Sequence, residues 1–231
     1  MSSKKFNKKY FKKIPLGFIV LLILFAAALY SFTWLAHEVV GEQEAWIDQR
    51  VFDLLAANVI NPSLTTFMKD VTFFASAQFL PFAYGAVFIV LILEKLYRRT
   101  LEVFLIGLGG FLIIYLMKIW FQRVRPPDPL IGHLSNYSFP SGHATSGFVF
   151  YGMLLFLLWK TSMKNIYKYL IGVVLISFAL LIGFSRIYLR VHYTSDVMAG
   201  FCIGLAWMAL SVWVLEKMKK KSDKEISMEV E

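Results

Sequence analysis

Six stretches of this chain contain no charged side chain, or only one, and each is close to the length that crosses a lipid bilayer. A membrane-spanning helix needs about 20 apolar residues, within a range of about 17 to 25. The pattern therefore predicts an integral membrane protein with six helical spans. The predicted spans are Ile14–Ala36, Val71–Leu93, Val103–Gln122, Ala144–Trp159, Tyr169–Ser185 and Val197–Leu215.

The overall composition agrees with this interpretation. Of the 231 residues, 58% are hydrophobic and 17% are charged, whereas about 25% of the residues in a soluble domain are charged. Such an excess of apolar side chains excludes both a soluble globule of this size and a disordered chain. Cys202 is the single cysteine, so no disulfide can form within the chain.

Lysine and arginine residues predict the orientation of the chain. Most of the 24 cations lie in four clusters, which six spans would place on one side of the membrane: residues 4–13, 95–99, 160–168 and 217–224. The positive-inside rule assigns that side, and both termini, to the cytoplasm. We therefore expect a single membrane domain, 1–231, with a basic cytoplasmic tail at 1–13 and a cytoplasmic tail at 216–231. The net charge of +9 then reflects topology, and no nucleic acid partner is expected.

The segment between the first two predicted spans, residues 37–65, is too polar to cross the membrane. Within Gly41–Asn61, apolar residues recur at helical spacing with charged residues between them, which is typical of an amphipathic helix. The Asn61-Pro62 dipeptide is expected to end this helix. We predict that segment 37–65 lies at the outer membrane interface.

Three polar clusters interrupt the apolar pattern. They lie at the end of the third span, before the fourth span, and between the fifth and sixth spans. By the topology derived from the charges, all three lie at the outer face. The clusters are Lys118 with Arg125-Pro126, then Pro140-Ser141-Gly142-His143, and finally Ser185-Arg186 with His192 and Asp196.

The cations of these clusters favour a bound phosphate. Lys118, Arg125 and Arg186 have few acidic residues near them in the sequence, and charged groups at membrane depth are usually functional. The segment Ser141–His143 leads into a helix, whose free backbone N–H groups also attract an anion. A glycine at position 142 leaves room for close approach of a ligand.

The two histidines predict acid–base or nucleophilic chemistry on that phosphate. His192 and Asp196 are four residues apart and share one face if the segment is helical. A carboxylate there can fix the tautomer of the imidazole and leave the other ring nitrogen free to attack. His143, from another segment, is placed to protonate a leaving oxygen.

Together the three clusters resemble the signature of the type 2 phosphatidic acid phosphatase (PAP2) superfamily, across residues 118–196. The resemblance implies an all-α integral membrane protein with a PAP2 helical core, and the six-helix layout resembles the bacterial phosphatidylglycerophosphatase B group. It also implies a mechanism without metal or cofactor, in which His192 forms a phosphohistidine, Asp196 orients it and His143 acts as the acid. The implied phosphate-binding residues are Lys118, Arg125, Ser141, Gly142 and Arg186.

The leading hypothesis is a lipid phosphatase that hydrolyses phosphatidylglycerophosphate to phosphatidylglycerol at the outer face of a bacterial plasma membrane. Its partners would be a lipid phosphate substrate and membrane lipids. The alternative substrate is undecaprenyl pyrophosphate, a lipid carrier of cell-wall synthesis. A lipid transporter and a vanadate-dependent oxidase are hypotheses of other classes, and the sequence leaves the oligomeric state open.

Overall fold

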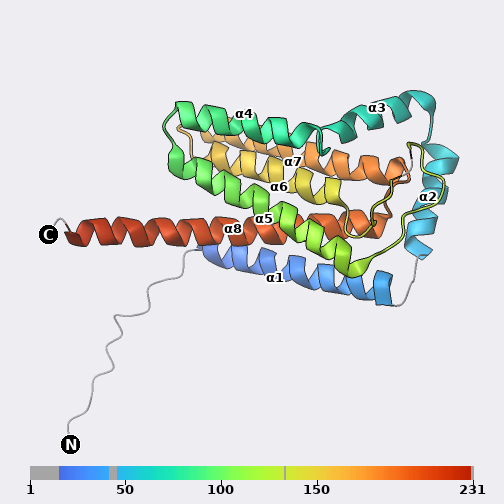
Figure 1. Cartoon of the computed structure of the whole chain (residues 1–231), viewed down its shortest axis with the longest axis horizontal. Helices are drawn as coiled ribbons and strands as arrows, with labels where there is room; N and C mark the ends of the chain where they lie inside the picture. The colour runs from blue at the N-terminus through green and yellow to red at the C-terminus, as the bar shows by residue number, and fades with distance from the viewer. Residues whose placement is uncertain (1–15, 42–45, 133, 230–231) are drawn as a thin grey trace, which may run out of the picture.

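The structure, a computed structural model, describes residues 16–41, 46–132 and 134–229. Every regular element in this part of the chain is helical (Figure 1). The predicted tail at 1–13 lies outside the described residues. The elements are α1 (Leu16–Ala36), a π-helical turn η2 (His37–Gly41), α2 (Trp46–Asn58), α3 (Pro62–Phe73), α4 (Phe79–Leu93), α5 (Tyr97–Phe121), α6 (Gly142–Trp159), α7 (Asn165–Tyr188) and α8 (Thr194–Glu229).

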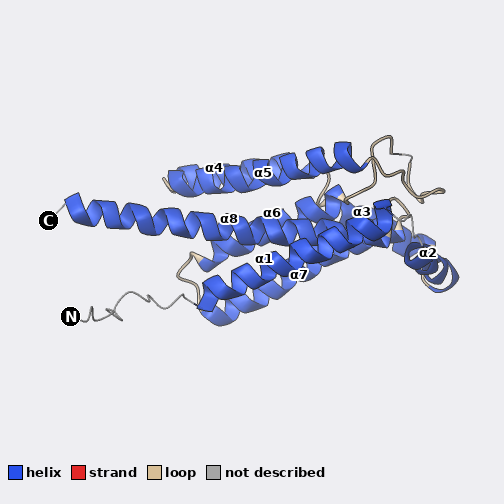
Figure 2. Cartoon of the chain, turned by 90° about the horizontal axis from the view of Figure 1, so that it is seen from below, coloured by secondary structure: helices blue, strands red, loops and turns tan. Residues whose placement is uncertain are grey.

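Five of the six predicted spans are helices long and apolar enough to cross a membrane, namely α1 with η2, α5, α6, α7 and α8. They run side by side as a bundle in Figures 1 and 2. Helix α8 does not end at residue 215 but continues to Glu229, so most of the segment predicted as a tail, 216–231, is helical.

The second predicted span, Val71–Leu93, is not one continuous helix. It comprises the end of α3, a break at residues 74–78, and α4, which has 15 residues. The Ser76 hydroxyl accepts a hydrogen bond from the Phe79 backbone N–H at 3.0 Å, and a serine that bonds the backbone in this way favours a new helix start. A hydropathy pattern contains no information on this hydrogen bond, so the break could not be predicted from the apolar run. Helices α3 and α4 follow one another along the bundle in Figure 1.

Helix α2 lies across one end of the bundle, where we predicted an amphipathic helix (Figure 1). The Asn61-Pro62 dipeptide, which we expected to end this helix, begins α3 instead, because α2 already ends at Asn58. The Asn61 side chain accepts a hydrogen bond from the Leu64 N–H at 2.9 Å, and Pro62 occupies the first turn of α3. Asparagine as a cap followed by proline at the first helical position is a strong helix start. The dipeptide therefore turns the chain from α2 into α3.

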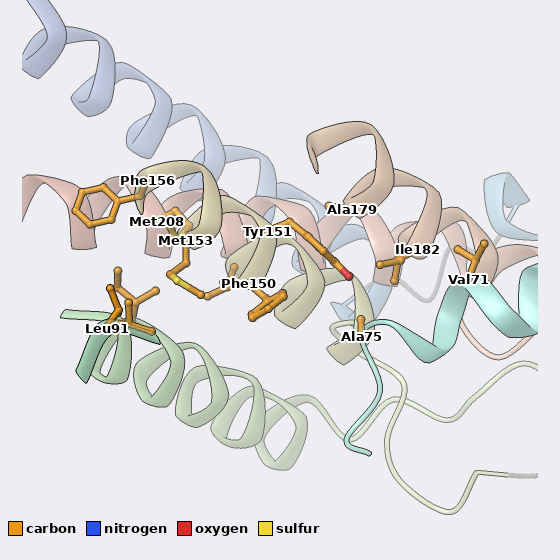
Figure 3. Close-up of a cluster of buried hydrophobic side chains, with 13 residues drawn as sticks. Val71, Ala75, Leu91, Phe150, Tyr151, Met153, Phe156, Ala179, Ile182 and Met208 are labelled. Atoms are coloured by element: carbon orange, nitrogen blue, oxygen red, sulfur yellow. The ribbon is translucent and has the colours of Figure 1, made fainter. Parts of the chain in front are cut away.

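The main core joins side chains from α3 to α8 (Figure 3). Met153 and Ile182 are fully buried in it, and Met208 of α8 lies beside Met153 (Figure 3). By contrast, large apolar side chains on the outside of the bundle are exposed, including Phe82 at 80% and Trp120 at 83%. A surface of this kind is stable in lipid and not in water.

Helices α6 and α8 approach closely at Gly200. A Cβ atom added there would lie 2.8 Å from the Ser141 carbonyl oxygen and 3.1 Å from the Ala144 Cβ. Because the first of these atoms belongs to the backbone, the start of α6 would have to move. Glycine at position 200 is therefore required for the packing of α6 on α8.

We expect Gly200→Ala to destabilise the protein by about 1 to 3 kcal/mol, because the added methyl group overpacks the contact. Thermal unfolding in detergent, followed by circular dichroism, measures the change. Gly85→Ala is the control, since nothing lies within 4 Å of a Cβ added at Gly85. Equal unfolding temperatures for the two variants would contradict the role of Gly200.

Candidate active site

Four helix ends meet at the end of the bundle that α2 crosses. Helix α5 ends there, α6 begins, and α7 passes through a short turn into α8 (Figures 1 and 2). The loop from Gln122 to Ser141 crosses the same end. It is held by hydrogen bonds from the Leu130 N–H to the Leu189 carbonyl at 3.0 Å and from the Ser141 N–H to the Asp196 carbonyl at 2.9 Å. This meeting of helix ends brings the three polar clusters together.

His192 and Asp196 form the buried pair expected from their spacing. The His192 Nδ1 lies 3.3 Å from Asp196 Oδ2, and both side chains are almost completely buried. The same carboxylate oxygen accepts hydrogen bonds from the Tyr193 N–H at 2.9 Å and from the Ser138 hydroxyl. The carboxylate is therefore fixed by several donors and holds the imidazole in one orientation.

The second nitrogen of His192 faces a cation. Its Nε2 lies 3.1 Å from Arg125 Nη1. A guanidinium only donates, so Nε2 accepts this bond and the ring proton resides on Nδ1, toward Asp196. The Nε2 lone pair is thus directed to the side of the ring where Arg125 lies.

The three predicted phosphate-binding cations have only neutral partners. Arg125 donates to the Val191 carbonyl and to Asn136, and Lys118 donates to the Tyr137 carbonyl. Arg186 is 2% exposed, and its Nη1 donates to the Thr72 hydroxyl at 2.7 Å while its Nε has no partner. Within the described residues, no carboxylate forms an ion pair with any of the three.

The start of α6 lies against these cations. The Ser141 side chain caps the helix by accepting a hydrogen bond from the Ala144 N–H. A Cβ added at Gly142 would lie 3.7 Å from Lys118 Cε, so this turn faces the lysine side chain. His143 follows on the same turn, partly buried and within electrostatic reach of His192 and the cations. All eight predicted site residues therefore lie at one end of the bundle.

Sequence reasoning missed three residues of the network. Ser138 binds Asp196, and Asp48 of α2 is bound to Arg123 and Ser195. Arg123 is held by two carboxylates, at 3.0 Å from Asp48 and 2.6 Å from Asp196.

One signal for Asp48 was present in the sequence. Phe52 and Leu55 follow Asp48 by four and seven residues and are the buried apolar residues of α2. Because this spacing places all three on one face, Asp48 lies on the apolar face of the helix. A carboxylate on such a face requires a partner.

The side chains at this end suit an anion. Among residues 16–41, 46–132 and 134–229, no group of three His, Cys, Asp or Glu side chains is arranged to hold a metal ion.

Burial lowers the pKa of His192 to about 3, although the hydrogen bond and charge of Asp196 oppose the shift. The imidazole is therefore neutral at physiological pH, and its Nε2 carries no proton.

Residues 82–220 match the family model of the PAP2 superfamily. The chain belongs to the PAP2 superfamily. It is 30% identical to phosphatidylglycerophosphatase B of Bacillus subtilis over 212 residues, which cover 89% of this chain and 97% of that protein. It is 31% identical to undecaprenyl-diphosphatase BcrC of the same organism, over 47% of this chain and 53% of that one.

A crystal structure of a transmembrane PAP2-type phosphatidylglycerolphosphate phosphatase from Bacillus subtilis has the same fold as this PAP2 protein. The TM-score is 0.76 and the identity 26%, and the match covers 84% of this chain and 96% of the other. The predicted all-α membrane fold is confirmed by this match.

We expect the His192 ring to stay neutral from pH 8 to about pH 4, because its pKa is lowered to about 3. In the unfolded chain the ring binds a proton below about pH 6.5. Stability should therefore fall as the pH drops from 6.5 toward 3. NMR of protein with 15N-labelled histidine, assigned with His192→Asn, measures the titration. A midpoint near pH 6.5 for this ring would contradict the expectation.

Proposed function

We propose that this PAP2 protein is a membrane lipid phosphatase that converts phosphatidylglycerophosphate to phosphatidylglycerol. The observation that carries the proposal is the His192 imidazole, which lies between the Asp196 carboxylate at 3.3 Å and the Arg125 guanidinium at 3.1 Å. Similarity to phosphatidylglycerophosphatase B over 89% of the chain supports the choice of substrate.

In the first step, the Nε2 lone pair of His192 attacks phosphorus, and the bond from phosphorus to the glycerol oxygen breaks. His143 donates its proton to the departing oxygen. The ring of His192 becomes positively charged as it is phosphorylated, and Asp196 stabilises that charge through the hydrogen bond from Nδ1. The product of this step is a phosphohistidine and the dephosphorylated lipid.

In the second step, water attacks the phosphohistidine. His143, now neutral, takes a proton from the water, and the bond from phosphorus to Nε2 breaks to release inorganic phosphate. The phosphoryl oxygens are held in both steps by the cations and by the first turn of α6, which stabilise charge in the transition state. The residues proposed for this role are Lys118, Arg125, Ser141, Gly142 and Arg186.

We further propose that this site faces outward from a bacterial plasma membrane and that both termini are cytoplasmic. The basic clusters at residues 95–99 and 160–168 support this orientation, because the connections α4–α5 and α6–α7 lie at the end of the bundle opposite to the turn between α7 and α8 (Figure 1). Segment 37–65 then lies at the outer interface. A phosphatase so placed acts on lipid headgroups in the outer leaflet.

The orientation can be measured by cysteine labelling of intact cells. In a Cys202→Ala background, Ser135→Cys should react with a membrane-impermeant maleimide, whereas Met163→Cys should react only after the cells are broken. Both positions are exposed and lie in loops at opposite ends of the bundle. The reverse labelling pattern would overturn the proposed orientation.

Undecaprenyl pyrophosphate is the second candidate substrate. The similarity to BcrC, which covers about half of this chain, favours it over other lipid phosphates. The mechanism above needs no change, because His192 can attack the terminal phosphorus and expel the lipid monophosphate. The choice between the two substrates is a matter of relative kcat/KM.

Purified protein in detergent should release inorganic phosphate from phosphatidylglycerophosphate, with and without EDTA. His192→Ala should reduce kcat at least about 10³-fold, since the nucleophile is lost. The assay compares kcat/KM for phosphatidylglycerophosphate, phosphatidic acid and undecaprenyl pyrophosphate. Undiminished release by a folded His192→Ala variant would overturn the mechanism, and a higher kcat/KM for undecaprenyl pyrophosphate would overturn the proposed substrate.

A further inference from the structure

Asp48 is a buried carboxylate that the proposed chemistry does not use. Its side chain is 2% exposed, although it belongs to α2, the helix at the end of the bundle. Its Oδ1 accepts the Ser195 N–H at 3.0 Å, and its Oδ2 accepts the Ser195 hydroxyl at 2.6 Å. Asp48 therefore lies against the first turn of α8, next to Asp196.

Arg123 connects Asp48 to Asp196. One terminal nitrogen, Nη2, lies 3.0 Å from Asp48 Oδ2, and the other, Nη1, lies 2.6 Å from Asp196 Oδ1. The guanidinium also lies over the Tyr193 ring, 4.0 Å from its centroid. Its planar fork is thus fixed on three sides, a geometry that a flexible ammonium would not reproduce.

The two oxygens of Asp196 have different partners. Oδ1 is bound by Arg123, whereas Oδ2 is the oxygen near His192 Nδ1. Arg123 therefore binds the oxygen of Asp196 that is not turned to the imidazole. This arrangement fixes the carboxylate from behind without competing for the ring.

We propose that Arg123 and Asp48 are positioning residues: Arg123 keeps Asp196 ionised and oriented toward His192, and Asp48 holds the guanidinium of Arg123 in place. Two buried carboxylates this close would otherwise favour proton uptake by one of them. A protonated Asp196 could not stabilise the charged, phosphorylated ring. Asp48 completes the arrangement because it orients Arg123, which is its ion-pair partner among the residues that the structure describes.

The charged and titratable groups around Asp196 come from every neighbouring element. They are Asp48 of α2, Lys118 of α5, Arg123 and Arg125 of the following loop, His143 of α6, Arg186 of α7, and His192 and Tyr193 of the turn before α8. Arg123 is the cation that contacts the carboxylate directly. Its removal should therefore weaken both the ionisation and the orientation of Asp196.

The experiment is a double-mutant cycle measured by phosphate release from phosphatidylglycerophosphate between pH 4.5 and 8.5. Arg123→Gln should lower kcat about 10- to 100-fold, the usual effect of losing a hydrogen bond to a charged group, with KM little changed. The acid limb of its pH profile, where kcat falls as the pH is lowered, should move to higher pH. Adding Asp48→Asn should restore part of kcat and move the limb back, because one of the two unbalanced carboxylates is then gone.

Two further variants separate this role from a structural one. Asp53→Asn removes the same charge from an exposed position of α2 and should behave as wild type. Asp48→Asn retains an oxygen that can accept the Ser195 N–H at the first turn of α8. As a single substitution, it should move the acid limb of the kcat profile to lower pH. If Asp48 only stabilised α8, the unfolding temperature would fall and the second substitution would bring no rescue.

The possible outcomes are distinct. A double variant no faster than Arg123→Gln overturns the inference. If Arg123→Gln does not fold, the test becomes the pH at which kcat of Asp48→Asn falls on the acid side. If that pH equals the value for Asp53→Asn, the inference is overturned. The inference rests on the proposed function: a wild-type protein that releases no phosphate refutes that function, whereas an active wild type with no effect at Asp48 refutes only the positioning role.

Discussion

The end of the bundle depends on a positive charge that the chain itself does not neutralise. Lys118, Arg125 and Arg186 are bound by carbonyl and hydroxyl oxygens, which satisfy hydrogen bonds but leave the charges unbalanced. Burying a cation in this way is costly, and the cost is offset only when an anion is bound. The way these cations are held therefore supports the proposed binding of phosphate at this end of the bundle.

Helix ends, more than side chains alone, make this arrangement possible. The first turn of α6 supplies free N–H groups, Gln122 ends α5 in a left-handed conformation, and the turn before α8 presents His192. Each end is fixed by a local bond, such as the Ser141 cap, and by contact with another helix, as at Gly200. The site residues are therefore positioned by rigid elements although they lie where those elements stop.

The sequence predicted the helical membrane fold and the convergence of the eight site residues, because both follow from strong local patterns. Apolar length marks a span, and His192 and Asp196 show helical spacing. The break at Ser76 was missed because a single hydroxyl-to-backbone bond decides it within an apolar run. Asp48 and Arg123 were not recognised as a pair because 75 positions separate them, and no periodicity links α2 to the end of α5.

The formal charges at the site bear on which phosphate it accommodates. Apart from the two histidines, the cations Lys118, Arg123, Arg125 and Arg186 and the carboxylates Asp48 and Asp196 leave two positive charges. A phosphomonoester dianion balances these two charges. Because Arg123 is committed to two carboxylates, it adds nothing to the field that a second phosphate would need. The pairing that orients Asp196 therefore leaves Lys118, Arg125 and Arg186 as the cations that the proposed phosphate would contact.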